Sequence, residues 1–253
     1  MKTSQEYRAS LAAMKHNVWL NGQKVDRPWE HPQIVPGINI VCLTYDRLRE
    51  EEENRNLFTA TSHLSGQTIN RFNHIHQSAD DLQKKVEMTR LYCRQTGCIQ
   101  RCMGVDALNA LSVICHSADS MFGTDYYPRL MAFVRTFQEQ DLVGNAAMTD
   151  VKGDRGLRPH QQADPDLYLH VVERRQDGIV VRGAKAHNTL APYAHELFVL
   201  PTRDMTAADA DYAVAFAIPA DAPGITMVCR GAAPTAPREM SSPLSRRYAT
   251  VES

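Results

Sequence analysis

The spacing of apolar residues changes character near residue 141. Before that point, apolar positions recur every three or four residues, which is typical of amphipathic helices. Thr3-Ser4-Gln5-Glu6 forms a capping box that predicts a first helix ending near Met14. Residues 19–55 contain three prolines and predict a loop-rich excursion over the surface. Further helices are predicted from residue 78, with an interruption at Gly97 before a second segment over 98–114, and over 128–140.

The second part of the chain shows short strand-like runs. Residues 141–164 have no clear period and predict a long loop, and loops of that length are often functional. Residues 167–173 and 179–181 flank Gln176-Asp177-Gly178, which predicts a hairpin turn. Further strands are expected at 197–200, 213–218 and 226–229. We therefore expect an α+β protein with a helical domain over residues 1–140 and an antiparallel β domain over 141–253, unfinished at its end.

Composition and charge exclude several classes of function. The 253 residues are 43% hydrophobic and 23% charged, as in ordinary globular proteins. A formal net charge of −1 gives no electrostatic reason to expect binding to nucleic acid or to an anionic membrane. No apolar run approaches the roughly 18 residues of a membrane span, and the first eight residues lack a signal-peptide core. We expect a cytoplasmic location.

Two cysteines are the clearest candidates for metal ligands. Cys98 and Cys102 are four residues apart, so on a continuous helix their thiols would share one face. Thiolates select zinc, copper(I) or iron–sulfur centres. A closed site of this kind usually takes four protein ligands, and no second cysteine pair follows. Two interpretations therefore stay open, a pair of ordinary buried thiols or one half of a metal site.

A second candidate is the irregular segment over residues 146–156. Lys152 and Arg155 lie there among glycines and small residues, and could hold phosphate oxygens while backbone N–H groups bind the same ligand. The alternative is a charged surface loop. The chain contains no Gly-rich dinucleotide motif and no P-loop, so neither of those nucleotide-binding folds is indicated.

A third candidate is the segment over residues 182–189, where a predicted strand runs into a polar cluster. Small residues there would let a ligand approach the backbone, and Lys185, His187 and Thr189 supply donors. The alternative is a strand end with solvated side chains. His74 and His76 could share the face of a strand and bind a metal, but their polar neighbours favour a loop and helix cap.

Several longer motifs in one order carry a resemblance to a known family. They are NRF (70–72), HQSADDL (76–82), CIQRC (98–102), AMTDVKGDRG (147–156), QADPDL (162–167) and DGIVVRGAKAH (177–187). Together they resemble the 4-hydroxybutyryl-CoA dehydratase/vinylacetyl-CoA Δ-isomerase branch of the 4-hydroxyphenylacetate 3-hydroxylase family. The resemblance spans nearly the whole chain, and motifs in series are far more specific than any one alone.

The resemblance implies an acyl-CoA dehydrogenase-like fold, with an N-terminal helical domain, a middle antiparallel β-barrel domain and a C-terminal helical bundle that is absent from this chain. It implies FAD between domains and a [4Fe–4S] cluster, with Cys98 and Cys102 matching two cluster ligands. The monooxygenase branch lacks this pair. The relatives are longer, and their other two cluster ligands, a His and a Cys, lie beyond residue 253. A partner chain supplying the C-terminal half is therefore expected, together with an acyl-CoA substrate and a homo-oligomeric state.

The family match also implies roles for individual residues. Thr189 matches a threonine near flavin and substrate and is the candidate catalytic residue. The candidate cofactor-binding residues are Met148, Thr149, Lys152, Asp154, Arg155, Lys185, His187 and Thr189. The implied reaction is the dehydration of 4-hydroxybutyryl-CoA to crotonyl-CoA, with vinylacetyl-CoA Δ-isomerase activity. The alternatives are an FAD-dependent aromatic hydroxylase with the same fold, in which the two cysteines are merely buried, and a non-catalytic fragment or subunit.

Overall fold

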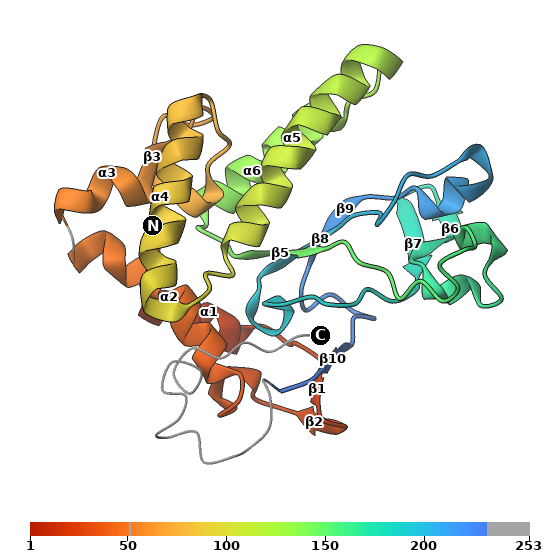
Figure 1. Cartoon of the computed structure of the whole chain (residues 1–253), viewed down its shortest axis with the longest axis horizontal. Helices are drawn as coiled ribbons and strands as arrows, with labels where there is room; N and C mark the ends of the chain where they lie inside the picture. Colours follow the sequence, from red (N-terminus) through yellow and green to blue (C-terminus); the bar gives the residue numbers. More distant parts are fainter. Residues whose placement is uncertain (51, 232–253) are drawn as a thin grey trace.

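The computed structural model describes residues 1–50 and 52–231 (Figure 1). The α-helices are α1 Ser4–Ala13, α2 Val35–Glu50, α3 Arg55–Phe58, α4 Ala79–Thr96, α5 Cys102–Phe122 and α6 Tyr126–Glu139. The strands are β1 Val18–Leu20, β2 Gln23–Val25, β3 Thr59–Thr61, β4 Thr68–Asn70, β5 Gly144–Ala147, β6 His170–Arg175, β7 Gly178–Arg182, β8 Glu196–Val199, β9 Phe216–Pro219 and β10 Met227–Cys229. No described helix is both long and apolar enough to cross a lipid bilayer.

The helices α1 and α4 begin and end at residues that cap them. The capping box at α1 is confirmed, since Thr3 Oγ1 accepts a hydrogen bond from Glu6 N at 3.0 Å and the Glu6 carboxylate accepts from Thr3 N. Ser78 caps α4 by accepting a hydrogen bond from Asp81 N, and Gly97 ends the helix at φ +75°. The predicted helix over 128–140 is confirmed as α6. His74 and His76 lie in the connection that leads into α4, as their polar neighbours indicated.

The loop-rich excursion predicted over residues 19–55 is wrong for most of its length, because its first part holds β1 and β2 and its second part is helical. Residues 35–50 form α2, with Pro36 in the first turn, where its missing N–H costs the helix nothing. Ile38, Val41 and Tyr45 of this helix are completely buried. Apolar residues at helical spacing therefore outweighed the prolines, because burying that face stabilises the helix.

The strands form four small sheets, in the orders β10-β1-β2, β3-β4, β5-β8-β9 and β6-β7. The predicted hairpin is confirmed as β6–β7. Two expectations are wrong. β5 lies inside the segment predicted as a continuous loop, and β5 pairs with β8 in parallel, as β1 does with β10. The implied closed barrel is not present among the described residues, because β5-β8-β9 and β6-β7 are joined only by an isolated bridge between Asp150 and Lys185.

The largest apolar cluster joins segments that are far apart in the sequence. Tyr7 and Leu11 of α1 and Ile38 of α2 pack with Leu190 and Leu197. At α5, Gly104 lies so close to β5 that a Cβ there would be 2.7 Å from the carbonyl oxygen of Gly144. The helical part and the strand-rich part thus share a core, and the division into domains at residue 141 stays a prediction.

Candidate functional site

The two cysteines lie at the ends of a tight turn between α4 and α5. Gly97 ends α4, so Cys98 lies in the connection and Cys102 is the first residue of α5. The expectation that both thiols share the face of one helix is therefore wrong, because the second helix begins four residues later than predicted. Cys98 is exposed and Cys102 half-buried, and the Cys102 thiol donates a hydrogen bond to the carbonyl oxygen of Ile99 at 2.9 Å.

The three residues between the cysteines anchor the turn. Ile99, Gln100 and Arg101 are each at most 2% exposed. Ile99 joins the apolar cluster between α2 and α4, and Gln100 Oε1 accepts a hydrogen bond from the hydroxyl of Tyr193. The turn is thus fixed from inside while its two thiols lie at the outer ends.

Arg101 fixes the same turn through a buried ion pair. Its Nη2 lies 2.5 Å from Asp141 Oδ1, and its Nη1 donates to Thr44 Oγ1 at 2.9 Å. The guanidinium also stacks on the ring of Tyr45, 4.4 Å from the ring centre. Asp141 precedes β5, so this pair ties the cysteine turn to the start of the strand-rich part.

Burial raises the pKa of the Cys102 thiol to about 11, and partial burial with the neighbouring Cys93 thiol raises the pKa of Cys98. Both are therefore thiols at neutral pH in the metal-free chain, and a metal would have to displace their protons. No group of three or more metal-ligating side chains gathers within residues 1–50 and 52–231. Two cysteines at an open turn fit half of a four-ligand cluster site.

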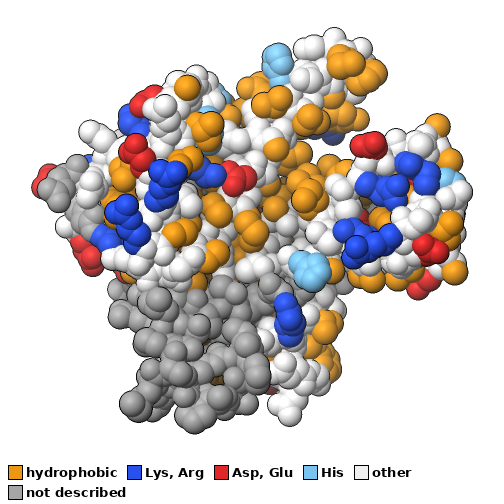
Figure 2. Space-filling view, in the orientation of Figure 1, with side chains coloured by type: hydrophobic (Ala, Val, Ile, Leu, Met, Phe, Trp, Pro, Cys, Tyr) orange, Lys and Arg blue, Asp and Glu red, His pale blue; other side chains and the backbone are white. Residues whose placement is uncertain are grey.

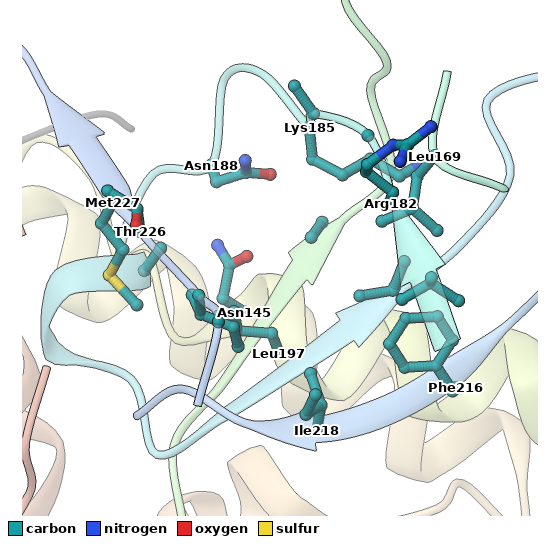
Figure 3. A pocket seen from close by; sticks show the side chains of 18 of the residues that line it. Asn145, Leu169, Arg182, Lys185, Asn188, Leu197, Phe216, Ile218, Thr226 and Met227 are labelled. Carbon is teal, nitrogen blue, oxygen red and sulfur yellow. The ribbon is translucent and has the colours of Figure 1, made fainter. Parts of the chain in front are cut away.

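A pocket of about 400 Å³ opens beside the β5-β8-β9 sheet (Figure 3). Leu197 and Val199 of β8 with Phe216 and Ile218 of β9 form an apolar wall. Residues 181–185 and 223–228 contribute most of the remaining lining. The volume lies in the range of small-molecule and cofactor sites, and walls of this kind suit the apolar body of a ligand.

Lys185 is the one candidate site residue that lines this pocket. Its Nζ lies 2.7 Å from Asp150 Oδ1 and donates to the carbonyl oxygens of Met148 at 3.1 Å and Leu200 at 2.8 Å. Burial lowers the pKa of Lys185, and Asp150 offsets part of that effect. The ammonium therefore holds β5 and β8 at their ends, a role that sequence reasoning did not foresee.

The structure brings the two candidate ligand-binding segments together. Ala186 N donates to the carbonyl oxygen of Thr149 at 2.7 Å, beside the bridge between Asp150 and Lys185. Thr189 is half-buried, and its carbonyl oxygen accepts a hydrogen bond from Asn145 Nδ2 at 2.5 Å. The Thr189 side chain is not part of the pocket wall.

The other candidate residues lie on the outer side of this junction. Met148, Asp154, Arg155 and His187 are exposed, and Lys152 is half-buried with φ +80°. Asp154 closes its own turn by accepting a hydrogen bond from Gly156 N. The side chains of Lys152 and Arg155 form no hydrogen bond or ion pair with the described residues, which leaves two cations available for phosphate oxygens.

Asn145 is a pocket residue that sequence reasoning missed. It is 0% exposed, lies on β5 and lines the pocket beside Asn188 (Figure 3). The sequence signal is one polar residue in the small-residue run Gly144-Asn145-Ala146-Ala147, within the segment predicted as a loop.

The comparisons with known proteins agree with this architecture. Residues 3–253 match the family model "4-hydroxyphenylacetate 3-hydroxylase N terminal". The chain therefore belongs to the 4-hydroxyphenylacetate 3-hydroxylase family. Within it, the chain is 47% identical over 229 residues to 4-hydroxybutyryl-CoA dehydratase/vinylacetyl-CoA-Δ-isomerase from Clostridium aminobutyricum, covering 90% of this chain and 46% of that protein. It is 30% identical over 252 residues to the 4-hydroxyphenylacetate 3-monooxygenase oxygenase component of Thermus thermophilus, covering 99% and 51%.

Solved structures give the same result. An oxygen-tolerant archaeal 4-hydroxybutyryl-CoA dehydratase from N. maritimus superimposes with a TM-score of 0.91 at 38% identity, over 99% of this chain and 50% of that one. The oxygenase component of 4-hydroxyphenylacetate 3-monooxygenase, complexed with FAD and 4-hydroxyphenylacetate, gives 0.80 at 28% identity, over 100% and 52%. The chain thus spans about half the length of these relatives.

Proposed function

We propose that this chain is the N-terminal part of an FAD- and [4Fe–4S]-dependent enzyme that dehydrates 4-hydroxybutyryl-CoA to crotonyl-CoA and isomerises vinylacetyl-CoA. The observation that carries the proposal is the anchored turn, which presents Cys98 and Cys102 at its ends while burying the three residues between them. The higher identity to the dehydratase than to the monooxygenases supports the same branch.

The described residues supply part of each cofactor site. Cys98 and Cys102 would hold one side of a cluster, and Lys152 and Arg155 would bind phosphate groups of FAD or of the CoA substrate. When bound, the flavin would supply one-electron redox chemistry and the cluster a Lewis-acidic iron. The chain's own contribution is positioning. Gln100 ties the cysteine turn to Tyr193, which follows Thr189 by four residues, so both candidate sites share one rigid support.

A partner that completes the site is part of the proposal. The dehydratase and monooxygenase relatives are about twice as long as this chain. The far end of α5 carries Val113, Ile114, Met121 and Phe122, each at least 64% exposed. Figure 2 shows hydrophobic side chains along this protruding end. An exposed apolar stretch of this kind is typical of a surface that another chain or domain covers.

The test is anaerobic purification of the chain with the co-expressed product of its neighbouring gene, followed by assay of crotonyl-CoA formation from 4-hydroxybutyryl-CoA. The proposal expects activity in the wild type and loss of activity in Cys98→Ala and Cys102→Ala. Cys115→Ala, a half-exposed cysteine further along α5, is the matched control and keeps activity. A complex that binds FAD but forms no crotonyl-CoA would refute the dehydratase assignment.

The family also supports a second candidate, an FAD-dependent aromatic hydroxylase, because the Thermus monooxygenase component matches 99% of the chain. Under that function Cys98 and Cys102 hold no cluster and have no role in catalysis. Hydroxylation of 4-hydroxyphenylacetate by the reconstituted complex, unchanged in Cys98→Ala and Cys102→Ala, would establish this alternative over the dehydratase.

A further inference from the structure

Asn145 holds a buried acceptor that faces the pocket. It is completely buried on β5, and its side chain is part of the pocket wall (Figure 3). Nδ2 donates to the carbonyl oxygen of Thr189 at 2.5 Å, and this bond fixes which end of the amide is which, because the reverse orientation would place two acceptors together. Oδ1 has no hydrogen-bond partner among the described residues.

The cations on the pocket wall do not supply the missing donor. Lys185 Nζ is held by Asp150 and by the carbonyl oxygens of Met148 and Leu200. Arg182 Nε donates to Asp166 Oδ1 at 2.9 Å. A buried acceptor without a partner is unfavourable and rare in native proteins, so each such group calls for an explanation.

We propose that Asn145 is a ligand-binding residue, whose Oδ1 accepts a hydrogen bond from an uncharged N–H or O–H group of a molecule that enters the pocket. The same amide fixes the backbone at Thr189, so ligand contact and the position of Thr189 are coupled through one side chain. This inference rests on the proposed function, which offers two such donors, the imide N–H of the flavin ring and the hydroxyl of the 4-hydroxyacyl thioester.

The pocket fits a ligand with an apolar body and a polar edge. Leu197, Val199, Phe216 and Ile218 form its apolar wall, and Asn145 lies near the middle of Figure 3, to the left of Phe216. A donor at the edge of such a ligand would satisfy Oδ1 while the body packs on β8 and β9. The side chain would then contribute orientation and specificity, as a few polar groups do in mostly apolar pockets.

The experiment compares Asn145→Leu, which removes both amide functions, with Asn145→Asp, which keeps the acceptor and, as the protonated acid, also a donor to the Thr189 carbonyl oxygen. Affinity for FAD is measured by flavin fluorescence on the complex with the partner chain. Affinities for 4-hydroxybutyryl-CoA and crotonyl-CoA are measured by calorimetry on the same complex kept free of iron, because the iron-loaded complex would convert the substrate during the titration. Asn109→Leu is the matched control, because Asn109 accepts from His76 N and donates to two carbonyls away from the pocket. Circular dichroism establishes that each variant is folded, and Asn145→Ser replaces Asn145→Leu if the latter is not.

Loss of the acceptor should weaken binding about 5- to 100-fold, with a smaller loss in Asn145→Asp and none in Asn109→Leu. Weaker FAD binding identifies the flavin as donor. Weaker binding of 4-hydroxybutyryl-CoA with unchanged crotonyl-CoA identifies the substrate hydroxyl. Wild-type affinities in every Asn145 variant would overturn the inference and leave the proposed function standing. A wild-type complex that binds none of the three compounds would overturn both.

Discussion

Replacing Lys185 with Met tests whether the Lys185 ammonium stabilises the fold or binds a ligand. The Lys185 side chain is 9% exposed and that of Asp150 is 2% exposed, and Nζ also holds the carbonyl oxygens of Met148 and Leu200. Breaking a buried pair by removing one partner costs about 3–5 kcal/mol, since the other charge is left uncompensated. Met keeps most of the packing of the lysine stem, so the loss reports on the ammonium.

For a protein of about 150–250 residues, each kcal/mol shifts the unfolding temperature by roughly 2–4 °C, so Lys185→Met should lower it by about 6–20 °C. The assay is thermal unfolding followed by circular dichroism. Adding Asp150→Asn should recover part of the loss, because the unpaired carboxylate is then gone. Lys84→Met, which removes an exposed pair with Asp80, is the control and should change the temperature by less than about 2 °C. An unchanged unfolding temperature with weakened cofactor binding would refute the stabilising role and assign Lys185 to the ligand.

Three further predictions follow from burial and close packing. Gly104→Ala should lower the free energy of unfolding, measured in urea, by about 1–3 kcal/mol, because its Cβ would lie 2.7 Å from the Gly144 carbonyl oxygen. Gly178→Ala is the control, since a Cβ there would have no atom within 4 Å. An equal loss in the two variants would contradict the argument. Burial lowers the pKa of His195 to about 3. The unfolded chain therefore binds a proton here that the folded chain does not, and this reduces stability as the pH falls from 6.5 to about 3. His195→Gln should lose this dependence when urea midpoints are compared at about pH 4.5 and 7.5. Burial raises the pKa of Glu196 to about 7, so stability falls as the pH rises from 4.5 through 7. Glu196→Gln should therefore be more stable than the wild type at about pH 8. A lower urea midpoint in this variant would refute the argument.

Local signals predicted the elements that carry their own chemistry. The capping box of α1, the N-cap Ser78 and the turn before Gly178 each place their hydrogen-bonding groups within a few residues, so the sequence was sufficient. Strand β5 was missed because Gly144-Asn145-Ala146-Ala147 has little strand propensity of its own. It is a strand because β8 pairs with it in parallel and α5 packs closely on it, and both partners are distant in sequence.

The candidate site, too, could be predicted only in part from the sequence. The motifs selected two separate segments, and the structure joins them by a hydrogen bond between Ala186 and Thr149, but spacing could not show what each side chain contacts. Lys185 stays a predicted cofactor-binding residue, and only the structure shows that its ammonium contacts Asp150 and two carbonyl oxygens. Asn145 carried no motif, and only the three-dimensional contacts reveal its unpartnered oxygen. Hydrogen-bond satisfaction is a property of the fold and not of the sequence pattern.

The most direct test of the central claim is the iron content of the complex after anaerobic purification and reconstitution with iron and sulfide. The account predicts about four iron atoms per chain in the wild type and in Cys115→Ser, with loss of most of the iron in Cys98→Ser and in Cys102→Ser. An iron-free wild-type complex, or the same iron content in all three variants, would contradict it.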